Sequence, residues 1–297
     1  MIQMVTEDSE GKVRDIPLSG RVYMRDFSNQ SSYSTGGAII CNGDLNAAGE
    51  FWLLGDSGSI HVNGDLEISG NPQISRDATA SGEYDEPGNP EIGGDRGGGR
   101  PVVYIPPVIP SDYLYLAEYI LKADGEFIEF GTSVGYPADE YKGWKFSDPK
   151  WEFASDEFFT GSYYIEGEAA VISSAPEGQV WDVTLICEGS IVISGNPNMR
   201  TYVSGLLLVT GADLEMGGES WQIYEGYMLV HEQLKLNGNA TLNGAIRVED
   251  AANDSGHVSE NLLDGNFELT YNGDLPPLSG RGRPRIHILS WRYEDYE

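Results

Sequence analysis

The fold is indicated most directly by one stretch of the sequence, Val62-Asn63-Gly64-Asp65-Leu66-Glu67-Ile68. Apolar and polar residues alternate along it, and alternation by two places Val62, Leu66 and Ile68 on one face of a β-strand. Between them, Gly64-Asp65 supplies a turn. A unit this short cannot bury its own apolar face, so it must stack on other units of the same kind.

Similar units recur along the chain. Gly43, in Cys41-Asn42-Gly43-Asp44-Leu45, lies 21 residues before Gly64, and Ile68-Ser69-Gly70-Asn71-Pro72 returns as Ile193-Ser194-Gly195-Asn196-Pro197. Such a period with several short strands predicts an all-β right-handed parallel β-helix, in which each coil circles a three-sided core. Leucine-rich repeats have a similar period but require a Leu-rich consensus with an Asn ladder, which this sequence lacks. We expect ten apolar residues to be mostly interior, with about one in four misassigned where two apolar residues are adjacent. They are Val62, Leu66, Ile68, Ile186, Ile191, Ile193, Leu208, Val209, Leu229 and Val230.

The predicted organisation has three parts. Residues 1–35 form a lead-in, 36–275 the β-helix and 276–297 a C-terminal capping strand and tail. The coils are interrupted at about 76–160 by a large insertion with a Gly-rich loop, one helix over Tyr113–Ala123 that Ser111 or Asp112 caps, and an aromatic-rich segment from residue 126. Because coils continue on both sides of this insertion, we expect part of 104–160 to pack laterally on the β-helix, with Trp144 and Trp151 at or near the contact.

Composition narrows the functional classes. Asp and Glu number 47 against 18 Lys and Arg, a formal net charge of −29, so nucleic acid and anionic membranes should be repelled. The two cysteines, Cys41 and Cys187, lie in equivalent apolar strands and are expected to be buried free thiols. Nothing approaches 18 uninterrupted apolar residues, and the N-terminus does not resemble a signal peptide.

The repeats also carry a resemblance to a known family. The chain resembles the C-terminal domains of PilX-type pilus-assembly proteins in four places. These are Val62–Asn71, Gly205–Val209 with Leu234–Ile246, the Pro-rich approach to the helix, and the closing Ile288–Arg292. The resemblance implies a bacterial extracellular or cell-surface protein that partners pilins or other surface proteins, with a membrane helix ahead of this sequence. It implies no catalytic residues. Bactofilins have similar Gly-Asp-Leu coils, but shorter ones without such an insertion.

Catalytic chemistry has little support in the sequence. Polysaccharide lyases and hydrolases on β-helices need clustered carboxylates, often with a basic residue, whereas pairs such as Asp213 with Glu215 occur throughout this acidic chain. The candidate bases inside the coils are Arg200, Lys235 and Arg247. Four histidines, His61, His231, His257 and His287, have no metal-binding spacing, and we expect His61 and His231 to point outward. We therefore predict no catalytic, cofactor-binding or metal-binding residues.

Two binding roles stay open. Acidic Glu249–Asp254 and Asp85-Glu86 are expected to be solvated turns, with calcium as the alternative. The aromatic-rich segment forms either a satellite core or an interaction surface, and for the surface the candidates are Tyr136, Tyr141, Trp144 and Trp151. The sequence thus predicts a non-catalytic extracellular or cell-surface structural and adhesion module, associated with type IV pili, and the alternative is a carbohydrate-binding or polysaccharide-cleaving β-helix.

Overall fold

The computed structural model describes residues 4–7, 13–16, 37–129, 135–136, 142–155, 159–203, 205–218, 222–252, 254 and 256–273. Residues fall into two compact units, one made of 1–32 with 284–297 and the other of 33–283. In the first unit, β1 (Met4–Glu7) and β2 (Val13–Ile16) pair in an antiparallel hairpin. The predicted lead-in and capping strand therefore lie mostly outside the described residues.

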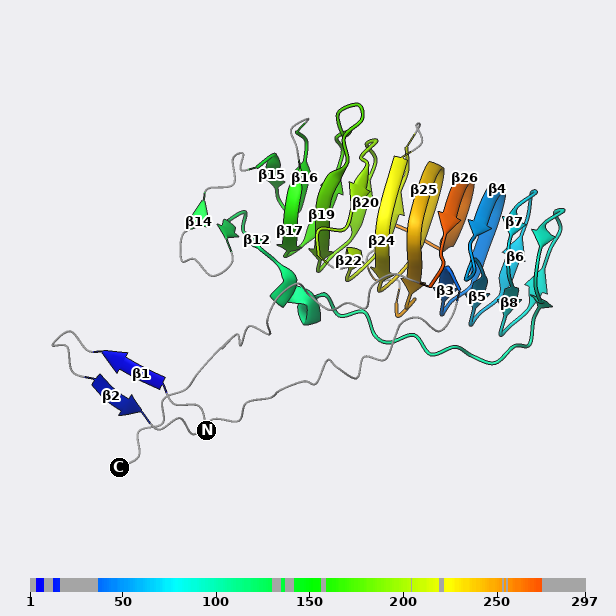
Figure 1. The fold of residues 1–297 in the computed structure, drawn as a ribbon, viewed down its shortest axis with the longest axis horizontal. Coiled ribbons are helices and arrows are strands. Elements are labelled where there is room, and N and C mark those ends of the chain that lie inside the picture. Colours follow the sequence, from blue (N-terminus) through cyan, green and yellow to red (C-terminus); the bar gives the residue numbers. More distant parts are fainter. Residues whose placement is uncertain are drawn as a thin grey trace. The chain divides into compact units, whose positions relative to one another are not determined.

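The second unit is nearly all β-structure, as predicted, and its strands lie side by side in successive coils (Figure 1). Most pairs are parallel and join one coil to the next. Ile60 of β5, for example, lies opposite Ile39 of β3 on one side and Ala78 of β8 on the other. The chain passes through three faces in each coil, and the strands of each face are paired by backbone hydrogen bonds with their counterparts in the adjacent coil.

Face 1 is the sheet that contains β3, β5 and β8. Its strands, in spatial order, are β12 (Tyr119–Leu121), β17 (Thr160–Ile165), β19 (Trp181–Cys187), β22 (Leu206–Thr210), β24 (Gln222–Val230), the end of β25 (Leu234–Val248), β3 (Ile39–Cys41), β5 (Ile60–Val62), β8 (Ala78–Ala80) and β11 (Arg96–Gly97).

Face 2 follows face 1 across a corner of the coil. It contains β16 (Lys150–Phe153), β18 (Glu168–Val171), β20 (Ile191–Ile193), β23 (Leu214–Met216), the start of β25, the start of β26 (Asn261–Thr270), the start of β4 (Leu45–Leu54), β6 (Leu66–Ile68) and β9 (Tyr84–Asp85). Face 3 completes the coil with the start of β19, β21 (Met199–Arg200), the start of β24, the middle of β25, the ends of β26 and β4, β7 (Gln73–Ile74) and β10 (Glu91–Ile92).

The corner between faces 1 and 2 explains the recurring Gly-Asp pair. Asp44 Oδ1 accepts the Asp65 N–H at 2.8 Å, and Asp65 Oδ1 accepts the Glu83 N–H at 2.7 Å in the next coil. These carboxylates lie against Gly64 and Gly82, where a Cβ would fall 2.3 and 2.1 Å from them. Glycine is thus needed here for close approach between coils, and each aspartate satisfies a turn N–H of its neighbour.

The corner between faces 2 and 3 is a bend in continuous strands. Gly49 in β4 and Gly265 in β26 lie opposite each other with φ of +94° and +121°, a region that other residues rarely adopt. A single strand can therefore serve two faces, which is why β4 and β26 each contain ten residues.

The coils are not stacked in chain order. The last strands, β25 and β26, pair in parallel with the first, β3 and β4, and β26 and β4 match over ten residue pairs. Residues 37–97 build one end of the stack and residues 119–273 the rest (Figure 1). The chain returns between the two parts through residues 98–118, which we call the strap.

This order replaces the insertion that we predicted at about 76–160. Residues 78–97 contain β8 to β11 and continue the stack, the strap crosses its side, and strands β12 and β16 lie at the opposite end. The predicted lateral packing thus applies to the strap and not to the aromatic segment. The helix over Tyr113–Ala123 is also shorter than predicted. It is a single 3₁₀ helix, η2 (Pro110–Leu116), because the chain becomes extended at Ala117 and joins β12.

The aromatic segment closes the end of the stack near β16. Its strands include the antiparallel pairs β12 with β13 (Phe127–Glu129) and β15 (Trp144–Ser147) with β16, and β13 also pairs with β14 (Gly135–Tyr136). Rings of Trp144, Phe153, Phe159 and Trp181 pack with centroids 3.9–5.7 Å apart. These rings belong to the main core, so they form neither an exposed aromatic surface nor the separate satellite core that we expected.

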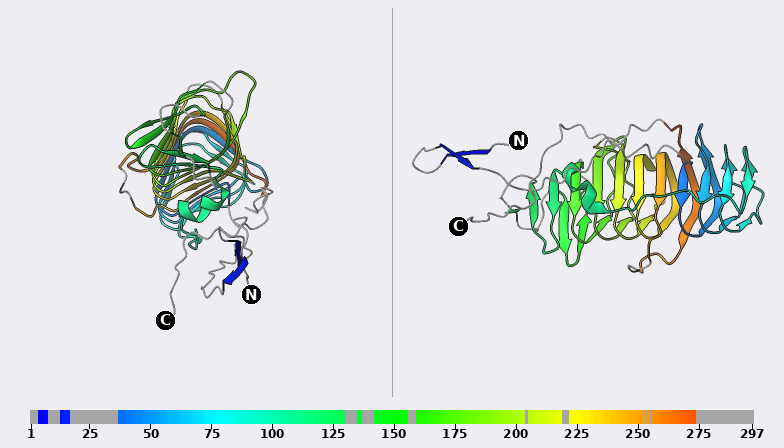
Figure 2. Two further views of the ribbon diagram at one scale, coloured as in Figure 1. Left: turned by 90° about the vertical axis from the view of Figure 1, so that its left-hand side faces the viewer. Right: turned by 90° about the horizontal axis from the view of Figure 1, so that it is seen from below.

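All ten predicted interior residues are buried, from Val62 to Val230. Three of the ten, Ile186, Val209 and Leu229, point outward and are buried beneath the strap, which agrees with the expected misassignment of about one in four. In β19, Leu185 points inward and Ile186 outward, yet both are fully buried because η2 lies on that face (Figure 2). Both members of an adjacent apolar pair are therefore covered, one by the interior and one by the strap. Cys41 and Cys187 are buried free thiols, as predicted.

Candidate interaction surface

The strap is held on the stack by a first polar clamp at Asn63. The Asn63 side chain accepts the Val103 N–H at 2.8 Å and donates to the Val103 carbonyl at 2.7 Å. It also donates to Asn42 Oδ1 at 2.6 Å and contacts His61 Nε2 at 3.2 Å. Because Asn63 Oδ1 can only accept, neutral His61 carries its proton on Nε2, and Nδ1 accepts from Thr79 Oγ1 at 2.8 Å.

A second clamp lies at Glu249. Its Oε2 accepts the Val108 N–H at 2.7 Å and contacts His231 Nδ1 at 2.6 Å. Glu249 follows β25 and His231 follows β24, so both stand at the same corner of the coil as Asn63. The corner that follows face 1 therefore provides a row of polar side chains that fix the strap across several coils.

Beneath the strap lies a row of outward-facing side chains of face 1. The row contains one residue from each coil, and each lies opposite the next in register: Ile186, Val209, Leu229, Arg247, Ile40 and His61. All are buried, although alternation points them away from the central core. His61 was expected to be outward and is, but it is only 9% exposed, and this burial lowers its pKa.

The strap ends on a third set of contacts. The Ser162 hydroxyl donates to the Leu116 carbonyl at 2.6 Å and accepts the Glu118 N–H at 3.0 Å. Glu118 then accepts the hydroxyl of Tyr202 at 2.7 Å, which raises the pKa of Tyr202 to about 12. These contacts fix the direction in which the chain enters β12.

The outer side of the strap is apolar. Along its extended part, Val103, Ile105 and Val108 face the stack, and Val102, Tyr104 and Ile109 alternate with them and face solvent. The exposed fractions of Val102 and Tyr104 are 71% and 79%. This surface was missed in the sequence, where residues 101–110 were treated only as the approach to a helix. Val102 to Ile105 are all apolar, so the sequence carries no alternation that would have separated the exposed residues from the buried ones.

The four predicted surface residues are not brought together. Trp144 and Trp151 are fully buried in the aromatic end of the stack, so neither can contribute to a surface. Tyr136 lies in β14, but its side chain, like the whole of Tyr141, is outside the described residues. Aromatic composition alone could not separate core from surface here, because the neighbouring coil that buries these rings is formed by residues 160–193.

Three of the acidic candidates for calcium, Glu86, Glu249 and Asp250, bond to protein groups. Asp250 Oδ1 accepts an N–H from Gln233 at 2.6 Å, and Glu249 is part of the second clamp. Buried Asp213 accepts the N–H groups of Gln233 and Val258 at 2.9 and 2.8 Å, which fastens the loop before β26 to the stack. Across the described ranges, no three His, Cys, Asp or Glu residues form a group that could hold a metal ion.

The basic residues considered for an enzymatic groove have structural partners. Lys235 Nζ pairs with Glu215 at 2.7 Å on neighbouring strands of face 2, and Arg200 pairs with Asp182 on face 3. Arg247 is buried beneath the strap and donates to the Ile246 carbonyl at 2.8 Å. The three lie on different faces, so they do not converge on one groove.

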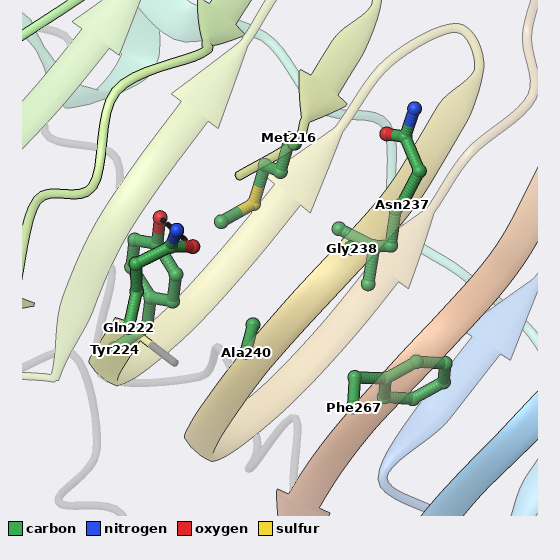
Figure 3. Close-up of a pocket in the computed structure, with 9 residues that line it drawn as sticks. Met216, Gln222, Tyr224, Asn237, Gly238, Ala240 and Phe267 are labelled. Carbon is green, nitrogen blue, oxygen red and sulfur yellow. Dashed lines mark hydrogen bonds between the residues drawn. The ribbon is translucent and has the colours of Figure 1, made fainter. Parts of the chain in front are cut away.

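A small cavity lies near the face 2–face 3 corner (Figure 3). Its volume of about 20 Å³ admits a single water molecule. Met216, Tyr224 and Phe267 supply much of its lining, and the Gln222 amide donates to Asn196 at 2.7 Å. With so little space and its main polar group already bonded, this cavity cannot hold a substrate.

No protein-family model matches this chain, and no curated protein matches it significantly. Among solved structures, it matches the crystal structure of the competence-associated pilin ComZ from Thermus thermophilus, with a TM-score of 0.43 and 11% identity. The alignment covers 86% of this chain and 75% of that chain. Similarity at this level carries no conclusion about function. Among the described residues, no helix has the length and apolar character needed to cross a bilayer.

Proposed function

We propose that this protein is a non-catalytic structural and adhesion module of the cell surface, and that its stack is a right-handed parallel β-helix. The observation that carries the proposal is the use of corner carboxylates as acceptors for backbone N–H groups of the next coil, at Asp44, Asp65, Asp77 and Asp213. A carboxylate held in this way stabilises the scaffold and is poorly placed to exchange protons with a substrate.

Association with type IV pili is the narrower part of the proposal and rests on the repeat resemblance. Pilins or other surface proteins are the proposed partners. The stack belongs to the continuous unit of residues 33–283, and the two chain ends, 1–32 and 284–297, together form the other compact unit.

Glycan binding is the alternative function. Tyr104 presents an exposed ring, and exposed tyrosine rings stack on sugars. In this alternative the module would bind or cleave polysaccharides along the strap side.

The test uses the whole chain with a panel of acidic and neutral polysaccharides. We expect no new reducing ends or unsaturated products and no retention on immobilised glycans, together with surface labelling of intact cells by an antibody against the stack. Turnover that disappears on replacing one carboxylate would overturn the proposal. No cofactor is proposed either, and the melting temperature should be equal in calcium and in a chelator, whereas a rise with calcium would reveal a cation site.

A further inference from the structure

Exposed apolar side chains are concentrated on the strap. Seven large hydrophobic residues are exposed in the described part of the chain: Val102, Tyr104, Ile109, Tyr115, Ile172, Tyr202 and Ile223. Four of them belong to the strap, and Tyr202 is joined to its last residue, Glu118. A stripe of this kind on an otherwise charged surface marks an interaction site.

The strap is rigid enough to present this stripe. Prolines at 101, 106, 107 and 110 restrict its backbone, and the clamps at Asn63 and Glu249 hold it at Val103 and Val108. Its outward side chains are thereby fixed before any partner arrives. Preorganised contact groups lose little conformational entropy on binding, so even a narrow stripe can contribute affinity.

The charge around the stripe indicates what it binds. The strap contains two carboxylates, Asp112 and Glu118, and one basic residue, Arg100, which pairs with Asp95 at 3.7 Å. On the adjoining corner, Glu249 contacts the strap at Val108, and the backbone of Glu188 lies against Gly211, on which Pro110 of the strap also packs. Anionic lipid and a second copy of this acidic chain would both be repelled, whereas a basic protein segment would be attracted.

We propose that the outer face of the strap, centred on Val102, Tyr104 and Ile109, docks a basic amphipathic segment of another protein. The apolar side chains of that segment cover the stripe, and its Lys or Arg side chains meet the flanking carboxylates. This proposal names the partner chemistry of the proposed adhesion function and rests on it.

The test compares matched variants of the full chain. Ile109 and Ile223 are 42% and 41% exposed, but Ile223 lies on β24, away from the strap. A short synthetic peptide of alternating lysine and leucine serves as the probe, and a lysine–serine peptide of equal length controls for charge. Calorimetry should show that Ile109→Ser, and Val102→Ser with Tyr104→Ser, weaken binding of the lysine–leucine peptide about tenfold, whereas Ile223→Ser leaves it unchanged.

Several outcomes would overturn the proposal. They are equal binding by all variants, equal binding of both peptides, and strap-dependent binding to anionic vesicles or to glycans in place of the peptide. Because these side chains are exposed, the variants should keep the parent melting temperature, which separates lost binding from lost folding. If the protein cleaved polysaccharides and still bound the peptide, only the proposed function would be wrong. If it neither bound the peptide nor cleaved polysaccharides, only the docking proposal would be wrong.

Discussion

The carboxylate of Asp44 occupies the space that a side chain at position 64 would need. A Cβ on Gly64 would lie 2.3 Å from Asp44 Oδ1 and 2.6 Å from the Gly43 carbonyl carbon. Gly64→Ala should therefore push two coils apart and lower the free energy of unfolding by about 2–3 kcal/mol. Urea unfolding measures this. Gly217→Ala is the control, because its nearest neighbour lies at 3.4 Å and it should cost less than about 1 kcal/mol. Equal losses would refute the close-approach explanation.

The aromatic end should respond to loss of its tryptophans. Trp144→Ala and Trp151→Ala each remove a fully buried ring and should destabilise the protein by about 3–5 kcal/mol, seen as a lower melting temperature. Phenylalanine separates packing from hydrogen bonding. Trp151 Nε1 donates to the Lys122 carbonyl at 2.9 Å, whereas Trp144 Nε1 has no partner within the described residues. Trp151→Phe should thus cost more than Trp144→Phe.

A third tryptophan, Trp52, serves as a control because its ring is more exposed than those of Trp144 and Trp151. Trp52, half-buried on the outer side of β4, should lose less stability on replacement by alanine than either of them. Full stability in both Trp144→Ala and Trp151→Ala would show that the end of the stack is not held by these rings.

The cysteines should be unreactive in the folded protein. Burial raises the pKa of Cys187 to about 12, and burial together with the nearby Asp250 charge raises that of Cys41 still further. A disulfide-exchange reagent at pH 8 should label neither thiol in the native chain and both in urea. Rapid native labelling would mean that these strands open readily.

Acid should weaken the strap through His61. Burial lowers its pKa below 6.5, so the unfolded chain takes up a proton as pH falls through that value while the folded chain does not. Stability from this site is complete above pH 6.5 and is lost as pH falls toward the folded pKa. Between pH 7 and 5.5, the urea midpoint should fall more in the parent than in His61→Gln. Parallel slopes would contradict this, since carboxylates titrate equally in both.

Much of the local structure could be predicted from the sequence, because alternation at Val62, Leu66 and Ile68 and the glycine at position 64 are enforced within one coil and its neighbour. The order of coils could not. The edge of β3–β4 offers the same parallel hydrogen bonds to β5–β6 as to β25–β26, and residue patterns do not distinguish these partners. The strap escaped notice for a related reason, since its inward and outward residues differ only by what lies beneath them.

The reordered stack predicts that the strap can be cut without separating its two parts. A protease site inserted between Gly98 and Gly99, both exposed, should yield two fragments that co-elute on size exclusion. Pairing of β3 with β25 and β4 with β26, and the stacked rings of Phe51 and Phe267 with centroids 4.9 Å apart, would hold them together. Urea should separate them. Separation under native conditions would show that this junction is too weak to act as a continuous part of the stack.

The same junction determines how the module would respond to tension. The chain enters at β3–β4 and leaves after β26, and β4 and β26 run parallel in register over ten pairs. Pulling the two ends apart draws these strands lengthwise past each other, so their hydrogen bonds share the force and must fail together. Coils at either end of the stack stay unloaded. Tension on such a protein is resisted at its centre, where a stack in chain order would have unwound coil by coil.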